Sequence, residues 1–175
     1  MRYVAFLRGI NVGGNNMVGT ERLRGVFSSL GFEDVKSYIN SGNIVFDSRR
    51  QADDKLSSRI HDAVKNELEI DVSIVVRTMD EIEDVIGNNP LDGEFDDDKK
   101  MNVFFLIEEL PKEKERLLME NSSEGEQFAV RGREIFCHLK NGFANSLIAK
   151  GFIEKKLKVM ATARNWRTVK KIAEM

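Results

Sequence analysis

Cysteine is almost absent from this sequence, and its single residue, Cys137, excludes a disulfide within the chain. A lone thiol is typical of a reducing compartment, so we expect a cytoplasmic protein. The fold must then be held together by its hydrophobic core. With 175 residues, 41% of them hydrophobic, the chain is long enough to bury roughly 70% of its unfolded surface.

Long apolar runs and an excess of one charge are also missing. No run approaches the ~20 apolar residues of a membrane span, and the apolar part of the opening MRYVAFLRG, about five residues, is too short for a signal peptide. Lys and Arg number 27 against 29 Asp and Glu, a net charge of −2. Proteins that bind nucleic acid without sequence preference are usually basic. We therefore expect neither a membrane nor a nucleic acid as partner.

The spacings that mark metal and catalytic sites are missing as well. No pair of His or Cys residues has the spacing of a metal site. Cys137 and His138 adjoin on an expected strand, where neighbouring side chains point to opposite faces, so Cys137 is interpreted as buried and structural. His61 is interpreted as a surface residue. The run Asp96–Asp98 has the composition to attract Mg²⁺ or Ca²⁺, but is more typical of a solvated loop. We expect no metal and no cofactor.

What the sequence does contain is a regular alternation of strand and helix patterns. In the first half we expect a strand at 3–7, a helix from Thr20 as N-cap to Leu30 with Gly31 as C-cap, strands at 35–39 and 43–47, a helix through Leu56 and Leu68, a strand at 72–76, and a helix carrying Ile82. In the second half we expect a strand at 102–107, a helix at 111–120, a hairpin around 131–133, a largely helical segment at 144–157, a strand at 158–163, and a helix at 164–175.

Both halves share one order of elements, which predicts an α+β fold built from tandem duplicated ferredoxin-like (βαββαβ) units with an extra C-terminal helix. Local matches support duplication: 4–7 parallels 103–106 at an offset of 99, and 41–43 parallels 131–133 at an offset of 90. The first half is thus nine residues longer between its first strand and its hairpin, which is the length of the segment RGINVGGNN at 8–16. The alternative is that two α+β units share these patterns by chance. Expected boundaries are 1–88, a linker at 89–100, and 101–175.

The first strand of each half is apolar on both faces. A sheet with one open face alternates apolar and polar residues, so the second face is expected to be covered by the other half or by a second chain. The second possibility predicts a homo-oligomer.

Four segments of the sequence resemble one known family: RYVAFLRGINVGG, SYINSGNIVF, NNP and the closing TARNWRTVKKI. Together they are similar to the bacterial family known as domain of unknown function 1697. The resemblance spans nearly the whole chain and implies a compact, duplicated α+β fold in the cytoplasm, with no reaction, substrate or cofactor assigned. The chain departs from the expected TTRNW at Ala163, although Thr162 and Arg164 remain.

The segment RGINVGGNN connects a strand to a helix and is rich in residues that hold anions. Glycines allow positive φ, which lets backbone N–H groups converge on a phosphate or carboxylate, and an arginine adds a charge-assisted contact. Its spacing matches neither the Walker loop nor G-x-G-x-x-G. The alternative is a surface loop whose asparagines cap its own backbone. The predicted ligand-binding residues are Arg8, Asn11, Gly13, Gly14, Asn15 and Asn16, with Asn43 and Arg164 as further contacts.

The favoured function is therefore binding of a small anionic ligand at this loop, with no reaction assigned and enzymatic activity left open. The second hypothesis is an oligomeric interaction module without catalysis. A third, less favoured, is an RNA-binding unit, because RNA-recognition domains share the βαββαβ order but need exposed aromatic residues and usually a basic surface. Trp166 is interpreted as a core residue, and the Ser41–Asn43 segment as a hairpin turn with a possible polar role.

Overall fold

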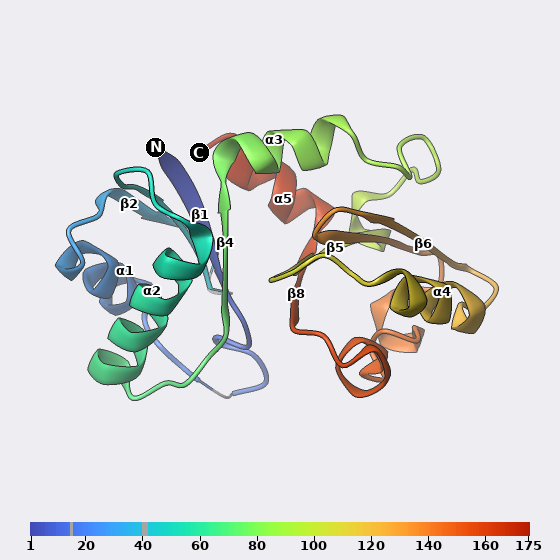
Figure 1. The fold of residues 1–175 in the computed structure, drawn as a ribbon, viewed down its shortest axis with the longest axis horizontal. Helices are drawn as coiled ribbons and strands as arrows, with labels where there is room; N and C mark the ends of the chain where they lie inside the picture. Colours follow the sequence, from blue (N-terminus) through green and yellow to red (C-terminus); the bar gives the residue numbers. More distant parts are fainter. Residues whose placement is uncertain (15, 40–41) are drawn as a thin grey trace. The chain divides into compact units, whose positions relative to one another are not determined.

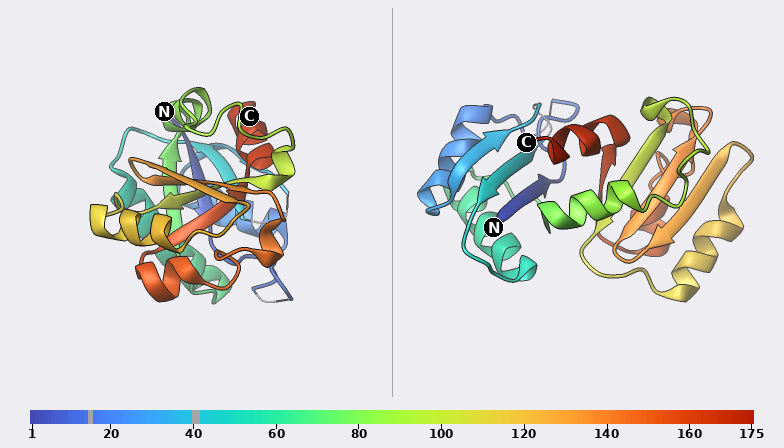
Figure 2. Two further views of the ribbon diagram at one scale, coloured as in Figure 1. Left: turned by 90° about the vertical axis from the view of Figure 1, so that its right-hand side faces the viewer. Right: turned by 90° about the horizontal axis from the view of Figure 1, so that it is seen from above.

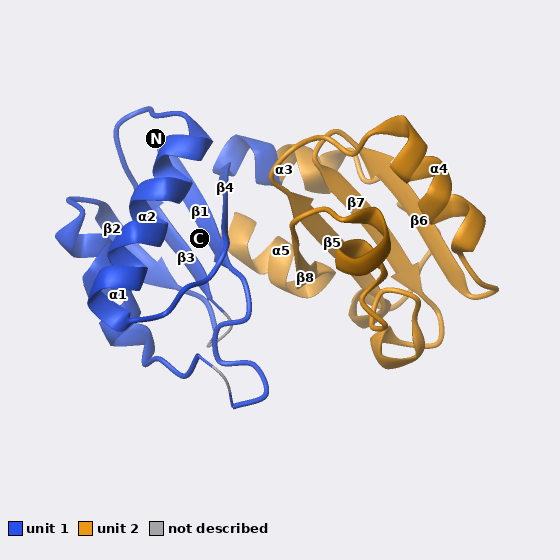
Figure 3. Cartoon of the chain, turned by 60° about the horizontal axis from the view of Figure 1, so that its bottom comes forward, with its two compact units in different colours: residues 1–82, 175 blue, residues 83–174 orange. Residues whose placement is uncertain are grey.

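The computed structural model describes residues 1–14, 16–39 and 42–175. It is an α+β structure in which the chain divides into two compact units, Met1–Ile82 with Met175, and Glu83–Glu174 (Figure 3). The division falls between residues 82 and 83, a few residues before the expected linker, and residues 89–100 group with the second unit. Each unit contains one four-stranded antiparallel sheet.

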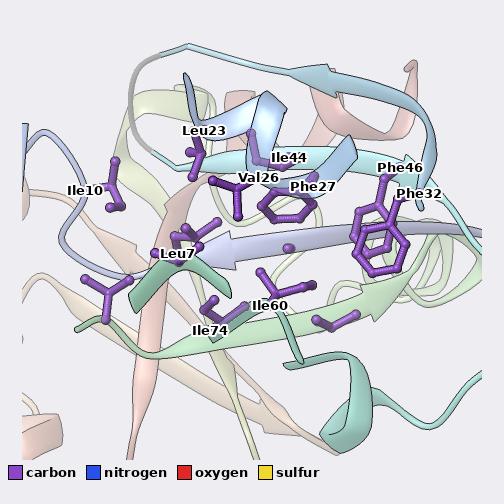
Figure 4. Close-up of a cluster of buried hydrophobic side chains, with 14 of the residues drawn as sticks. Leu7, Ile10, Leu23, Val26, Phe27, Phe32, Ile44, Phe46, Ile60 and Ile74 are labelled. Atoms are coloured by element: carbon purple, nitrogen blue, oxygen red, sulfur yellow. The ribbon is translucent and has the colours of Figure 1, made fainter. Parts of the chain in front are cut away.

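The first unit is an antiparallel sheet of order β2-β3-β1-β4 with two helices (Figure 1). Its elements are β1 (Arg2–Leu7), α1 (Thr20–Ser29), β2 (Glu33–Ser37), β3 (Asn43–Asp47), α2 (Asp53–Leu68) and β4 (Ile74–Thr78). Both helices pack on the sheet face that carries Tyr3, Ala5 and Leu7, and their buried residues form the core of this unit (Figure 4).

Residue spacing explains these two helices. In α2, buried Leu56, Ile60, Val64 and Leu68 recur every fourth residue and make one apolar stripe. The expected N-cap of α1 was one residue wrong: Gly19 occupies the cap position and Thr20 is the first helical residue. Gly31 follows α1 with a φ of 77° and closes it as expected, its N–H donating to the Ser28 carbonyl.

The second unit repeats this sheet, with the order β6-β7-β5-β8. Its elements are β5 (Met101–Leu106), α4 (Lys112–Asn121), β6 (Glu126–Arg131), β7 (Glu134–Leu139), β8 (Ala161–Asn165) and α5 (Trp166–Ala173). Helix α3 (Met79–Gly87) spans the division between the units. Figure 2 shows α4 alongside the sheet of the second unit, next to β6.

The expected helix at 144–157 is wrong. Two short turns stand there instead, a 3-10 turn at Phe143–Asn145 and a π-helical turn at Ile153–Leu157. Gly151 separates them with a φ of 79°, and the Ser146 hydroxyl bonds to local backbone, donating to the Phe143 carbonyl and accepting from Ala149 N–H. Such local bonds compete with a continuous helix. The following strand begins at Ala161 rather than at 158.

Strand pairing corrects the alignment of the two units. Val4 faces Val45 and Val103 faces Phe136, so β3 and β7 correspond at an offset of 91, not 90. In the same register, Leu7 N–H donates to the Gly42 carbonyl and Leu106 N–H to that of Arg133, both at 2.8 Å. Between its first and third strands the first unit is therefore eight residues longer than the second, the difference between offsets of 99 and 91. Most of the extra length lies between β1 and α1, at residues 8–19, where the second unit has only 107–111 before α4.

The last strand of each sheet carries a buried arginine followed by a helix cap. Arg77 faces Val4 and Arg164 faces Val103 in the two ladders. Thr78 and Glu81 form a reciprocal capping box at the start of α3, in which each backbone N–H donates to the other side chain. Asn165 caps α5 by accepting from Arg167 N–H at 3.1 Å. The likeness between the halves therefore includes the helix after the fourth strand.

Candidate functional site

The Gly-rich loop is tied to the first unit at its base. Arg8 N–H donates to the Ser73 carbonyl at 2.9 Å, next to the last β1–β4 pair. Ile10 is fully buried in the core under α1 (Figure 4). The Arg8 side chain is half-buried at this anchored end. The loop therefore leaves the sheet from a fixed point rather than from a flexible one.

Two asparagines give the loop its shape. The Asn11 amide pairs with the backbone of Val18, its Oδ1 accepting from Val18 N–H at 2.7 Å and its Nδ2 donating to the Val18 carbonyl at 3.0 Å. Asn16 Nδ2 donates to the Gly9 carbonyl at 3.1 Å. These amides, expected as ligand contacts, thus also bond within the loop. Asn15 lies outside the described residues.

The tip of the loop is open to solvent. Gly13 and Gly14 are exposed, with φ values of 58° and 79°, and a Cβ at either position would meet no atom within 4 Å. Val12 and Met17 beside them are 58% and 68% exposed. Successive backbone N–H groups in a turn conformation can form a concavity that binds an anion.

Gly42, the residue before β3, lies against the start of this loop. A Cβ on Gly42 would lie 2.9 Å from the Leu7 carbonyl oxygen and 3.2 Å from Ile10 Cβ. Asn43 is fully buried, and its Nδ2 donates to the Tyr38 carbonyl at 3.1 Å. Gly42 is therefore packed against the start of the loop, and Asn43 joins β3 to the residue that follows β2. Ser41 lies outside the described residues.

Arg164 belongs to the second unit, so its contribution to the loop stays a prediction. It is 8% exposed, and its Nη1 donates to the Thr162 hydroxyl and the Ala163 carbonyl, both at 2.8 Å. Burial lowers its pKa to about 10, which leaves the guanidinium charged at neutral pH. Thr162 supplies the hydroxyl that Arg164 uses, whereas position 163 contributes only its backbone carbonyl to this contact.

Sequence reasoning missed the counterpart of Arg164 in the first unit. Arg77 is 1% exposed and its Nη1 donates to the Val76 carbonyl at 2.9 Å. The sequence does contain a signal for this pair. Arg77 directly follows the apolar run VSIVV at the end of an expected strand, as Arg164 follows ATA. A buried charge inside an apolar strand is costly without partners and marks a position worth testing.

Comparison with known proteins places the chain in a family. The profile described as Protein of unknown function (DUF1697) matches residues 1–136. The chain belongs to this family. A solved structure, the conserved bacterial protein SP0830 from Streptococcus pneumoniae, is similar to it with 27% identity and a TM-score of 0.78, over 99% of this chain and 97% of that one. None of the curated proteins compared with the chain matches it.

The other candidate residues of this DUF1697 protein are buried in the core or bonded to neighbouring residues. Cys137 is fully buried, and burial raises the pKa of its thiol, so it is not a poised nucleophile. Asp97 caps a short turn by accepting from Lys99 N–H, and Asp98 pairs with Lys170. Outside residues 15, 40 and 41, no three His, Cys, Asp or Glu side chains are grouped to hold a metal ion. Within the same described part, no helix is long and apolar enough to cross a membrane.

His61 of this DUF1697 protein lies on α2 between two carboxylates. Its Nε2 is 2.9 Å from Asp71 Oδ1 and its Nδ1 is 3.2 Å from Asp62 Oδ1, while Lys65 pairs with the other Asp71 oxygen at 2.6 Å. The hydrogen bond to Asp71, followed by that to Asp62, raises the pKa of His61. The ring is partly exposed, as the sequence predicted.

We expect Asp71→Asn to lower the pKa of His61 toward the ordinary value of about 6.5, as measured by NMR titration of the ring protons. Because the folded pKa is raised, the contribution of His61 to stability is complete below about pH 6.5 and is lost as the pH rises through the folded pKa. Asp62→Asn serves as the weaker comparison. An unchanged His61 pKa in Asp71→Asn would contradict the assignment.

Proposed function

We propose that this DUF1697 protein binds a small anionic ligand, carrying a phosphate or a carboxylate, at the tip of loop 8–16. The backbone N–H groups around Gly13 and Gly14 would hold the anion, and the Arg8 guanidinium would add a charge-assisted contact. The observation that carries the proposal is an exposed pair of positive-φ glycines on a loop whose base is fixed in the core.

The internal bonds of Asn11 and Asn16 support preorganisation of this tip. A loop already held in its binding conformation loses less conformational entropy when a ligand arrives. We therefore assign Asn11 and Asn16 a positioning role beside any contact of their own, and Asn43 a role in holding the neighbouring turn. Asn15 and Arg164 remain proposed as further ligand contacts.

The proposal predicts ligand stabilisation that depends on Arg8. With inorganic phosphate, ribose 5-phosphate and AMP as probes, saturation at about a hundred times Kd contributes about 2.7 kcal/mol, which raises Tm by about 5 to 10 °C in a chain of this length. Thermal unfolding should show this shift in the wild type and lose it in Arg8→Ala. Arg24→Ala, which removes an exposed arginine from α1, is the matched control and should keep the shift. An equal shift in Arg8→Ala would exclude the site.

An interaction module without a ligand is the competing proposal, and one observation favours it. Val12 and Met17 expose apolar side chains on the same loop tip, which is a surface suited to a second protein chain. Light scattering at micromolar concentration separates the two proposals. A dimer that dissociates in Met17→Asp would support the interaction module, and a monomer would contradict it.

We also propose that the two units are duplicated ferredoxin-like folds and that the protein is cytoplasmic. The antiparallel orders β2-β3-β1-β4 and β6-β7-β5-β8, each with a helix after its first strand, support the first point. The paired positions of Arg77 and Arg164 support duplication. The single reduced cysteine supports a cytoplasmic location.

A further inference from the structure

The second unit contains a pocket of about 460 Å³ that is separate from the Gly-rich loop. Its wall combines a buried imidazole, an aromatic ring and charges of both signs. The lining residues are Gly93, Glu94, Phe95, Asp96, Lys100, His138 and Lys140. The site joins the segment before β5 to the end of β7, which lie far apart in the sequence.

His138 lines this pocket, and a hydrogen bond at Nδ1 fixes its ring. The ring is 4% exposed, and its Nδ1 is 2.7 Å from Gln127 Oε1. The Gln127 amide is oriented by its Nε2, which donates to Glu94 Oε2 at 3.4 Å. Because an amide oxygen only accepts, Nδ1 carries the proton and Nε2 keeps a lone pair in the neutral ring. No residue in the described part of the chain hydrogen-bonds to Nε2.

Charges of both signs line the pocket around the ring, with Lys100 and Lys140 beside Glu94 and Asp96. Burial is the main cause that lowers the pKa of His138, followed by Lys140 and Lys100, and these lysines outweigh the opposing effects of Asp96 and Glu94. Lys100 and Lys140 both line the pocket, and their ammonium groups are suited to pair with an anion.

Phe95 gives the pocket an apolar wall. Its ring centroid lies 5.9 Å from that of His138 and 6.2 Å from that of Trp166, to which it is nearly perpendicular at 84°. Trp166 is itself buried, so Phe95 is supported from behind while remaining half-exposed. A fixed, half-exposed ring is suited to pack against an apolar or aromatic group.

We propose that this pocket binds a phosphate monoester whose organic group is aromatic. A monoanionic phosphate has one P–OH group, which donates to His138 Nε2, and negative oxygens, which pair with Lys100 and Lys140. The aromatic group packs on Phe95. This site lies in the second unit and does not depend on the Gly-rich loop.

The chain's two histidines allow a direct test, because His61 on α2 is a built-in control for nonspecific effects. Phenyl phosphate is titrated into the full-length protein at pH 5.5, below the second pKa of a phosphate monoester at about 6, so that the monoanion prevails. The ring signals of both histidines are followed by NMR, with His61→Gln used for assignment. We expect a saturable shift of His138 only. Phenol and inorganic phosphate, which each carry half of the ligand, should bind at least roughly tenfold more weakly.

Two variants make the result decisive. Lys100→Gln with Lys140→Gln removes two charges at the pocket without touching the core, and should weaken phenyl phosphate binding roughly tenfold or more. Arg8→Ala should leave the His138 shift unchanged, which separates this site from the loop. The proposal is overturned if both histidines shift alike, if His138 does not shift, or if the lysine double variant binds as the wild type does.

Discussion

Phe46→Ala is expected to lower the free energy of unfolding by about 3 to 5 kcal/mol, the usual cost of deleting a buried aromatic side chain. Phe46 is fully buried at the centre of a ring cluster on the first sheet (Figure 4). Its ring centroid lies 4.4 Å from that of Phe32, 5.4 Å from that of Phe27 and 5.7 Å from that of Tyr3. Alanine would leave a cavity that three neighbouring rings cannot fill without moving.

The measurement is urea unfolding followed by circular dichroism and by the fluorescence of the single tryptophan. Trp166 lies in the second unit and Phe46 in the first, so the two signals report whether the units unfold together. Phe143→Ala is the matched control, since that side chain is 44% exposed and should change stability by about 0.5 kcal/mol or less. A circular dichroism midpoint equal to that of wild type in Phe46→Ala would contradict the described core.

Gly42→Ala is the second large effect, with an expected loss of about 2 to 5 kcal/mol. Its φ of 70° costs a residue with a side chain about 1 to 2 kcal/mol. The added Cβ would also lie 2.9 Å from the Leu7 carbonyl oxygen, which is fixed in the β1 ladder, and overpacking of this kind costs about 1 to 3 kcal/mol more. The strain would fall where the turn meets the Gly-rich loop.

Gly13→Ala separates these two causes. Gly13 has a φ of 58°, but a Cβ there would meet nothing within 4 Å, so only the conformational cost of about 1 to 2 kcal/mol applies. Denaturant unfolding of both variants, without added ligand, gives the comparison. Equal losses would mean that backbone conformation alone requires glycine at position 42 and that the close packing on Leu7 and Ile10 contributes nothing.

Sequence periodicity predicted the regular elements well and the irregular ones poorly. The fourfold spacing in α2 and the apolar β1 and β5 were unambiguous, because burial on a sheet imposes those patterns. The helix predicted at 144–157 was wrong because the composition of the segment does not reveal the positive φ of Gly151 or the local hydrogen bonds of Ser146. The predicted hairpin offset was wrong by one residue. It was obtained by matching Gly42 with Gly132, but the connections that contain these glycines differ in length.

The sequence indicated which loop to consider as a candidate site, but not how that loop is held. Composition indicated the loop. The structure adds that Asn11 and Asn16 bond to the backbone of the same loop and that Gly42 lies against Ile10. The His138 pocket was invisible because its parts are separated along the chain. In the sequence, His138 was considered only with its neighbour Cys137. In the structure its ring contacts Gln127 and Phe95 instead.

The pairing of the Asn11 side chain with Val18 has a consequence for how far local motion of the loop can spread. Its two hydrogen bonds join the residue after buried Ile10 to a residue just before α1, so the chain is held on both sides of the exposed tip. Local opening of the tip can then occur without loosening β1 or the start of α1. Binding at the tip and the stability of the sheet are separated in this way.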